Sequence, residues 1–139
     1  MKGLSILVFA FNEQKKILST LKLINSIIKK TKIKYEIIVI NDGSTDQTIK
    51  IVNKYKKNNN KIRVLDFKNN QGITRSLKEG IKMAKFDKLT WFPGDDSFLS
   101  KNLKVFFELS TKSDLVNGFR DNKFVFNNVR KILSIINQL

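Results

Sequence analysis

The feature that most constrains this sequence is the alternation of short apolar runs with stretches of helical periodicity. Each run has the length of a strand in a parallel sheet, and the runs are residues 4–9, 36–40, 61–66 and 88–92. Apolar residues between the runs recur at helical spacing, as at Ile17, Leu21, Ile24 and Ile28. Strands that alternate with helices predict a mostly parallel sheet with helices on both faces. The expected fold class is therefore α/β.

Local signals predict where the elements begin and end. We expect Asn12-Glu13 to open the first helix and Ser44 or Thr45 to cap the second. The third helix is expected to run to about Lys85 and to carry an apolar face made of Ile73, Leu77, Ile81 and Ala84. The later elements are expected to be a helix near 99–110, a short strand at 114–117 and a helix at 124–139.

Two residue types are missing from the chain, and their absence limits its chemistry. The sequence contains no cysteine and no histidine, which excludes disulfides, thiol nucleophiles, and thiolate or imidazole metal ligands. Any metal must therefore be held by oxygen atoms, which favours Mg²⁺ or Mn²⁺ over zinc. The length of 139 residues fits one domain with one core over residues 1–139.

A strong excess of basic residues determines which partners the surface attracts. The sequence has 27 Lys and Arg against 12 Asp and Glu, a formal net charge of +15. Such a charge attracts nucleic acid, anionic lipid surfaces or phosphorylated substrates, although a compositional bias towards lysine is its favoured source. There is no recognisable nucleic-acid-binding motif, so nucleic acid is not an expected partner. No apolar run approaches the roughly 20 residues that cross a bilayer, and no signal peptide precedes the first strand, so a soluble or peripheral protein is expected.

Carboxylates follow three of the predicted strands. Glu13, Asp42 and Asp95 each come after a different strand, and ligands of parallel sheets bind outside the carboxyl ends of the strands. Asp42 is suited to accept hydrogen bonds from a base or ribose, although its loop alone favours a capped turn without a ligand. Asp95 and Asp96 repel each other unless a cation lies between them. They predict either a divalent ion on a nucleotide diphosphate or a solvated turn in which Asp96 caps the next helix.

Taken together, these loops resemble those of family 2, the large family of inverting glycosyltransferases with the GT-A fold. The shared motifs follow one another in the family's order and are Phe11-Asn12-Glu13, Asn41-Asp42-Gly43-Ser44-Thr45-Asp46, Asn70-Gln71-Gly72 with Arg75 and Gly80, and Pro93-Gly94-Asp95-Asp96. The resemblance implies a Rossmann-like GT-A sheet and a UDP- or GDP-sugar donor. It also implies that Asp95 is catalytic, that Asp95 and Asp96 hold Mg²⁺ or Mn²⁺, and that the nucleotide is bound by Phe9, Phe11, Glu13, Asp42 and Gly94.

The C-terminal part resembles the polyprenyl- and dolichyl-phosphate branch of that family. The resemblance is carried by Gly118-Phe119-Arg120 and by Arg130 with Ser134. It implies that Arg120 and Arg130 are catalytic and that both, with Ser134, bind the phosphate of a lipid acceptor, a task that suits a bidentate guanidinium. The expected function is transfer of a sugar from a nucleotide diphosphate to a polyprenyl phosphate. The expected location is peripheral, at an anionic membrane surface on the cytoplasmic side, where the helix 124–139 lies in the interface or packs on the core.

Two other functions stay open. One is transfer to a saccharide acceptor in envelope polysaccharide synthesis, which needs a carboxylate base, and the candidates after Asp96 are Glu108, Asp114 and Asp121. The other is a nucleotide-sugar-binding remnant without catalytic activity.

Departures from the family pattern bear on the metal and on the extent of the chain. Pro93 stands where the family has the first aspartate of an Asp-x-Asp loop, so metal binding depends on Asp95 and Asp96. Phe9 and Phe11 replace the usual Pro and Tyr, and a phenylalanine still packs near a base without donating a hydrogen bond. Relatives continue beyond Leu139, so the chain is expected to lack the C-terminal part of the family.

Overall fold

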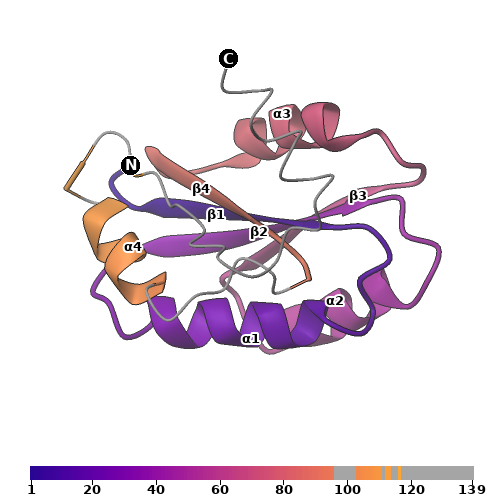
Figure 1. Ribbon diagram of the computed structural model, residues 1–139, viewed down its shortest axis with the longest axis horizontal. Helices are drawn as coiled ribbons and strands as arrows, with labels where there is room; N and C mark the ends of the chain where they lie inside the picture. Colours follow the sequence, from indigo (N-terminus) through magenta and orange to yellow (C-terminus); the bar gives the residue numbers. More distant parts are fainter. Residues whose placement is uncertain (96–102, 111, 114–115, 117–139) are drawn as a thin grey trace, which may run out of the picture.

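Four strands and four helices alternate along the part of the chain that the computed structural model describes, which is residues 1–95, 103–110, 112–113 and 116 (Figure 1). The elements are β1 (Leu4–Ala10), α1 (Ile17–Ile28), β2 (Tyr35–Asp42), α2 (Thr48–Lys57), β3 (Ile62–Phe67), α3 (Ile73–Met83), β4 (Lys88–Pro93) and α4 (Leu103–Ser110). All four predicted strands are present within two residues of their expected ends.

The strands form one parallel sheet in the order β3-β2-β1-β4. Val8 in β1 lies opposite Val39 of β2 on one side and Phe92 of β4 on the other, so β1 and β2 occupy the centre. Every residue of β2 is buried, which explains why this strand reads as an unbroken apolar run. The predicted parallel α/β sheet is confirmed.

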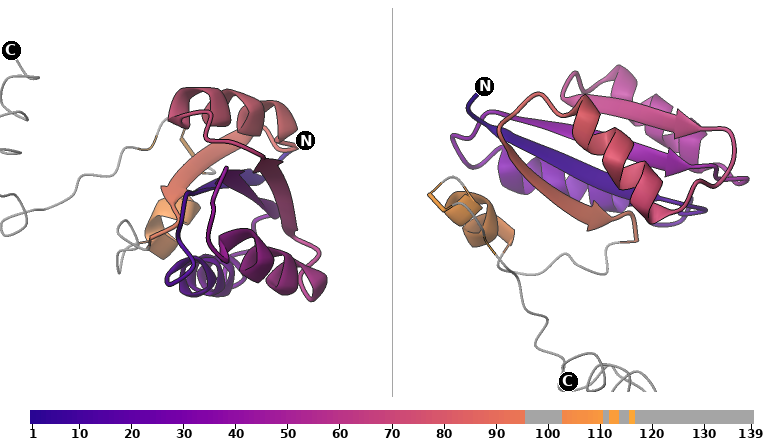
Figure 2. Two further views of the ribbon diagram at one scale, coloured as in Figure 1. Left: turned by 90° about the vertical axis from the view of Figure 1, so that its right-hand side faces the viewer. Right: turned by 90° about the horizontal axis from the view of Figure 1, so that it is seen from above.

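Helices cover both faces of the sheet, with α1, α2 and α4 on one face and α3 on the other (Figures 1 and 2). The larger core cluster lies on the first face, where β1 contributes Leu4, Ile6 and Val8 and α4 contributes Phe107. The smaller cluster lies beneath α3 and is built on Leu7, Ile38 and Ile40. Successive strand residues point to opposite faces, so the two clusters follow from the alternation within β1 and β2.

The face that α3 turns to the sheet matches the predicted one only in part. Ser76 and Gly80 are its buried residues, whereas Ile73 and Ile81 are 58% and 49% exposed. The reason is backbone proximity, since a Cβ on Gly80 would lie 2.4 Å from Cδ1 of Ile40. A small residue lets α3 approach the sheet. Of the predicted face, Leu77 and Ala84 do pack against the cluster beneath α3, whereas Ile73 and Ile81 do not.

Two helices begin later than predicted. α1 starts at Ile17 rather than at Asn12-Glu13, and the left-handed backbone of Asn12, with φ 57°, excludes that residue from a helix. α2 starts at Thr48, and its amide donates to Oδ1 of Asp46 at 2.9 Å, so neither Ser44 nor Thr45 is its cap. α3 ends at Met83, two residues before the predicted Lys85.

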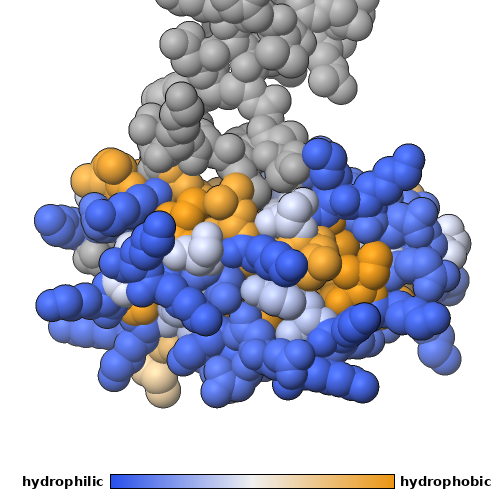
Figure 3. All heavy atoms as spheres, turned by 90° about the horizontal axis from the view of Figure 1, so that it is seen from below, coloured by the Kyte–Doolittle hydropathy of each residue, from blue (hydrophilic) through white to orange (hydrophobic). Residues whose placement is uncertain are grey.

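The C-terminal predictions are only partly covered by the described residues. α4 confirms the predicted helix near 99–110 over its last eight residues. The predicted helix 124–139 and, apart from Val116, the predicted strand 114–117 lie outside the described residues. None of the described helices is long and apolar enough to span a bilayer. Seen from below, mostly hydrophilic side chains surround smaller areas of apolar surface (Figure 3). On α4, the apolar side chains of Val105 and Leu109 are 52% and 44% exposed.

Candidate functional site

The loops that follow the four strands meet at the carboxyl edge of the sheet. Parallel strands end on the same side, which brings residues 11–16, 43–47, 68–72 and 94–95 together. The contacts are close enough to require glycine. A Cβ on Gly43 would lie 2.4 Å from backbone atoms of Asn69 and Asn70, and a Cβ on Gly94 would lie 2.7 Å from the carbonyl oxygen of Phe9. These loops therefore form one surface.

Asp42 ends β2 at the centre of this edge and is only 8% exposed. Its Oδ1 accepts hydrogen bonds from the Gln71 amide at 2.8 Å and from Oγ of Ser76 at 2.9 Å, and its Oδ2 accepts one from the Gly72 amide at 3.1 Å. The carboxylate thus lies at the N-terminus of α3, where the helix dipole favours a negative charge. A carboxylate has about four acceptor positions, so these three bonds leave one on Oδ2.

The loops after β1 and β2 are joined by side chain to backbone hydrogen bonds. The Glu13 amide donates to Oγ1 of Thr48 at 2.8 Å, and the Gln14 amide donates to Oδ2 of Asp46 at 3.1 Å. Burial alone raises the pKa of Asp46, but the hydrogen bonds from Thr48 and Gln14 outweigh it and lower the pKa. Asp46 therefore stays ionised and keeps its acceptor role at ordinary pH.

The two phenylalanines predicted at the nucleotide have different surroundings. Phe11 is 47% exposed at the start of the first loop, directly after β1, so its ring is open to a ligand. Phe9 is half-buried and packs against the cluster beneath α3, with its ring edge-on to Trp91 at a centroid distance of 5.9 Å. Phe11 is the better placed of the two to contact a base.

Gly94 and Asp95 lie where β4 meets the other loops. Gly94 is buried, its carbonyl oxygen accepts a hydrogen bond from Oγ1 of Thr20 at 2.8 Å, and the Cγ of Glu13 lies 3.4 Å from the Cβ that an alanine would add there. Asp95 is half-buried beside it, and Asp96 lies outside the described residues. Within the described part of the chain, no three acidic side chains gather in a way that could hold a metal ion. One carboxylate suffices where phosphate oxygens supply further ligands, so Asp95 fits a cation carried by a diphosphate.

The predicted acceptor residues Arg120, Arg130 and Ser134 also lie outside the described residues. Of the other two arginines, Arg75 is exposed on α3 and Arg63 belongs to a separate network at the opposite end of the sheet.

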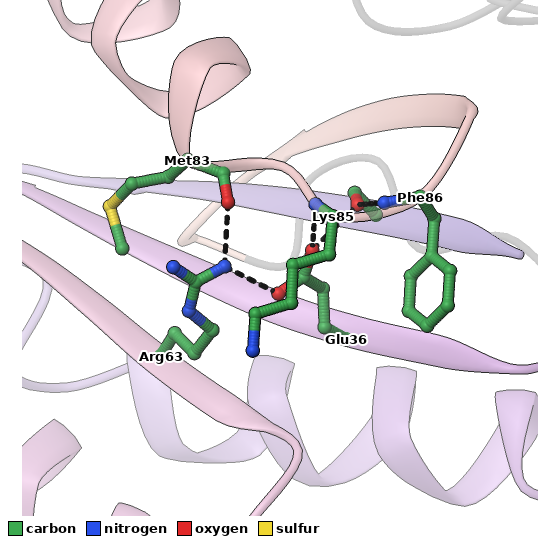
Figure 4. A network of polar contacts seen from close by, with 6 residues as sticks. Glu36, Arg63, Met83, Lys85 and Phe86 are labelled. Carbon is green, nitrogen blue, oxygen red and sulfur yellow. Dashed lines mark hydrogen bonds and ion pairs between the residues drawn. The ribbon is translucent and has the colours of Figure 1, made fainter. Parts of the chain in front are cut away.

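That separate network surrounds Glu36, near the start of β2 (Figure 4). Glu36 is 4% exposed and accepts hydrogen bonds from Oγ of Ser5 at 2.8 Å, the Lys85 amide at 2.6 Å and Nη1 of Arg63 at 2.8 Å. Arg63 also donates to the Met83 carbonyl at 2.6 Å. These bonds hold the segment between α3 and β4 against β2 and β3, a structural role remote from the carboxyl edge.

Sequence reasoning missed two residues at the carboxyl edge, Ser76 and Asn12. Ser76 is fully buried, and a polar residue within an otherwise packed helix face is the only sign of it. Asn12 joins the first two loops, and its signal is the preference of asparagine for left-handed backbone.

Comparison with known proteins gives this arrangement a context. The family model described as Glycosyl transferase family 2 matches residues 5–136. The chain is 35% identical over 95 residues to the poly-beta-1,6-N-acetyl-D-glucosamine synthase of Staphylococcus epidermidis. This aligned region covers 68% of this chain and 22% of the synthase. The chain thus spans about a fifth of the length of such curated relatives.

Solved structures agree with the family match. S. aureus TarS 1–349 in complex with UDP-GlcNAc is similar at 26% identity and a TM-score of 0.56, covering 78% of this chain and 32% of TarS. The mannosyltransferase PcManGT from Pyrobaculum calidifontis was solved with GDP-Man and Mn²⁺. It is 16% identical to this chain with a TM-score of 0.64, and the match covers 82% of this chain and 33% of the PcManGT chain. At that identity PcManGT bears on the fold alone. The predicted GT-A fold is confirmed.

Proposed function

Because the chain belongs to glycosyl transferase family 2, we propose that it binds a uridine diphosphate sugar and transfers the sugar to a saccharide acceptor. The observation that carries the proposal is the set of contacting loops at the carboxyl edge, with Asp42 fixed at its centre. The relatives support the substrate class, since one is named for a polymer of N-acetylglucosamine and another was solved with UDP-GlcNAc.

The chain's own residues give each part of the donor a place. The exposed ring of Phe11 stacks on the base, and the free acceptor position on Oδ2 of Asp42 takes a hydrogen bond from the nucleoside. Asp95 is half-buried where β4 meets the other loops, so its carboxylate is the group that faces the diphosphate and its cation.

In the transfer itself, an acceptor hydroxyl attacks the anomeric carbon of the sugar. The bond from that carbon to the phosphate oxygen breaks, and the nucleoside diphosphate leaves with the electron pair. A saccharide hydroxyl must also lose its proton to a base. Of the candidates for the base, Glu108 is an exposed residue of α4, 3.7 Å from Lys104, and Asp114 and Asp121 lie outside the described residues.

The saccharide acceptor replaces the polyprenyl phosphate that the C-terminal resemblance implied. That earlier expectation depends on Arg120, Arg130 and Ser134, which the structure does not describe. The relatives quoted above include a polysaccharide synthase, so they favour the saccharide alternative.

The proposal is tested by binding and transfer with the intact chain. Calorimetry should show micromolar binding of UDP and UDP-GlcNAc, and radiolabelled GlcNAc should appear in a β-1,6-linked GlcNAc oligosaccharide. Label in added polyprenyl phosphate but not in the oligosaccharide would overturn the saccharide acceptor. Binding of nucleotide without any transfer would favour the non-catalytic remnant, and no nucleotide binding would overturn the donor site as well.

A divalent cation is part of the proposal, with Asp95 as its carboxylate ligand. Such an ion neutralises the charge that develops on the leaving diphosphate. We expect EDTA to abolish transfer, Mn²⁺ or Mg²⁺ to restore it, and Asp95→Asn to lower it roughly 100-fold, the scale of losing a group that stabilises the transition state. Asp87→Asn is the matched control, because Asp87 is exposed before β4 at the opposite end of the sheet, where it accepts from the Gly3 amide. Equal rates for both variants, with and without EDTA, would contradict a role for Asp95 and for the metal.

A further inference from the structure

Asn12 has an unusual backbone at the point where β1 gives way to the first loop. Among the described residues it is the only one other than glycine with a positive φ, at 57°. Asparagine adopts this conformation more readily than most residues, and such a residue persists where surrounding contacts hold it. The contacts that hold Asn12 come from the next loop.

The side chain and backbone of Asn12 both bind the loop after β2. Its Oδ1 accepts hydrogen bonds from the Thr45 amide at 2.8 Å, the Asp46 amide at 3.4 Å and Oγ1 of Thr45 at 3.3 Å. Its own amide donates to Oγ of Ser44 at 2.9 Å. One residue therefore accepts from two backbone amides of a loop more than 30 positions away and donates its own amide to a side chain of the same loop.

These bonds join the segments that carry the proposed nucleoside contacts. Phe11 and Glu13 flank Asn12 directly, and Asp42 lies just before the loop that Asn12 binds. Residues 11–16 have no helix or strand of their own to order them. Their position relative to Asp42 thus depends on the bonds between the loops.

The core does not depend on Asn12. Its side chain is exposed, and α1 is held to the sheet by the buried residues Ile17, Leu21, Ile24 and Ile28. Removing the Asn12 carboxamide should therefore loosen the two loops while the sheet and helices stay folded.

We propose that Asn12 is a positioning residue for the nucleotide: it fixes the loop of Phe11 against the loop of Asp42 and so orders the donor site before the ligand arrives. This inference rests on the proposed function, because the ligand it serves is the uridine diphosphate moiety. Ordering the loops in advance lowers the entropy lost on binding, so the effect belongs in nucleotide affinity.

Three variants of the intact chain separate the two properties of Asn12. Asn12→Gly keeps the positive φ and removes the acceptor, Asn12→Ala removes both, and Asn12→Asp keeps both but adds a charge. Asn53→Ala is the matched control, because Asn53 is exposed on α2 away from the loops. Calorimetry with UDP should show affinity about tenfold lower for Asn12→Gly, lower still for Asn12→Ala, and unchanged for Asn53→Ala.

A second measurement on the ligand-free chain reports on the loops directly. Amide hydrogen exchange at Thr45 and Asp46 should be faster in Asn12→Gly and close to wild type in Asn12→Asp, with thermal midpoints within a few degrees of each other. Wild-type UDP affinity in Asn12→Gly, or unchanged exchange at these two amides, would overturn the inference. If the wild-type chain itself binds no uridine nucleotide while the amides respond as expected, the proposed function fails, and the inference then loses its ligand although the loop coupling stands.

Discussion

Replacing Gly43 by alanine should lower the free energy of unfolding by about 3 kcal/mol or more, which is a large part of the stability of a small domain. Gly43 has φ +74°, and a Cβ there would lie 2.4 Å from the backbone carbon of Asn69 and the backbone nitrogen of Asn70. The left-handed conformation costs an alanine about 1–2 kcal/mol, and the overlap with backbone atoms forces the two loops apart at further cost. Urea unfolding followed by the fluorescence of Trp91, the only tryptophan of the chain, measures the loss.

Gly72→Ala is the matched control for this substitution. Gly72 also has a positive φ, at +80°, but no atom lies within 4 Å of the position of its added Cβ. The free energy of unfolding that Gly72→Ala loses should therefore reflect backbone strain alone, about 1–3 kcal/mol. The difference between the two variants measures the contact between the loops after β2 and β3, and equal losses would contradict the close approach at Gly43.

Gly43→Ala should also weaken UDP binding, because Asp42 and the Asn70-Gln71-Gly72 turn no longer fit together.

The sheet could be predicted because its two central strands, β1 and β2, are buried on both faces. β2 reads as an apolar run from Ile37 to Ile40, and no surface exposure interrupts the pattern. The orientation of α3 could not be predicted in the same way. Its apolar spacing favoured Ile73 and Ile81 as core, but Gly80 and Ser76 allow a closer approach to the sheet than any bulky residue. Hydrophobic periodicity records which residues are apolar, and it does not record how closely two backbones approach.

The edge that holds the candidate site was predicted, and the bonds within it were not. Strand ends of a parallel sheet must meet, so Glu13, Asp42 and Asp95 could be assigned to one edge from their positions alone. The partners of Asn12 and Ser76 lie more than 30 residues away, and sequence spacing holds no information on them. For the same reason the sequence pattern predicts a helix start at Asn12, although the side chain of Asn12 binds the neighbouring loop.

Replacing Arg63 by methionine should cost about 3 kcal/mol at neutral pH, because it leaves the Glu36 carboxylate buried without its cation. The side chain of Glu36 is 6% exposed, and the Arg63 guanidinium lies 2.8 Å from it. The amide of Lys85 and the hydroxyl of Ser5 still donate to Glu36, which places the loss towards the low end for a broken buried pair. Urea unfolding at pH 7 measures it, and Lys82→Met, which removes a cation from the exposed pair with Glu79, should change stability by under about 0.5 kcal/mol.

The pH dependence of the free energy of unfolding should identify Glu36 as a group whose protonation destabilises the fold at acid pH. Burial raises the pKa of Glu36, but the hydrogen bonds from Arg63, Lys85 and Ser5 outweigh it and hold the pKa below its ordinary value of 4.5. A carboxyl group whose pKa is lower in the folded state binds its proton more readily when unfolded. Its contribution is therefore complete above about pH 4.5 and is lost as the pH falls through the lowered value.

Glu36→Gln and Arg63→Met should both flatten the loss of stability below pH 4.5, for different reasons. Glutamine removes the titrating group, whereas methionine removes the charge that lowers its pKa. At pH 7 Glu36→Gln should cost less than Arg63→Met, since a neutral amide is easier to bury than an unpaired carboxylate. If the free energy of unfolding of both variants falls below pH 4.5 as steeply as that of the wild type, other carboxylates cause the acid sensitivity. Asp46, whose pKa is also lowered, is then the first of them to replace.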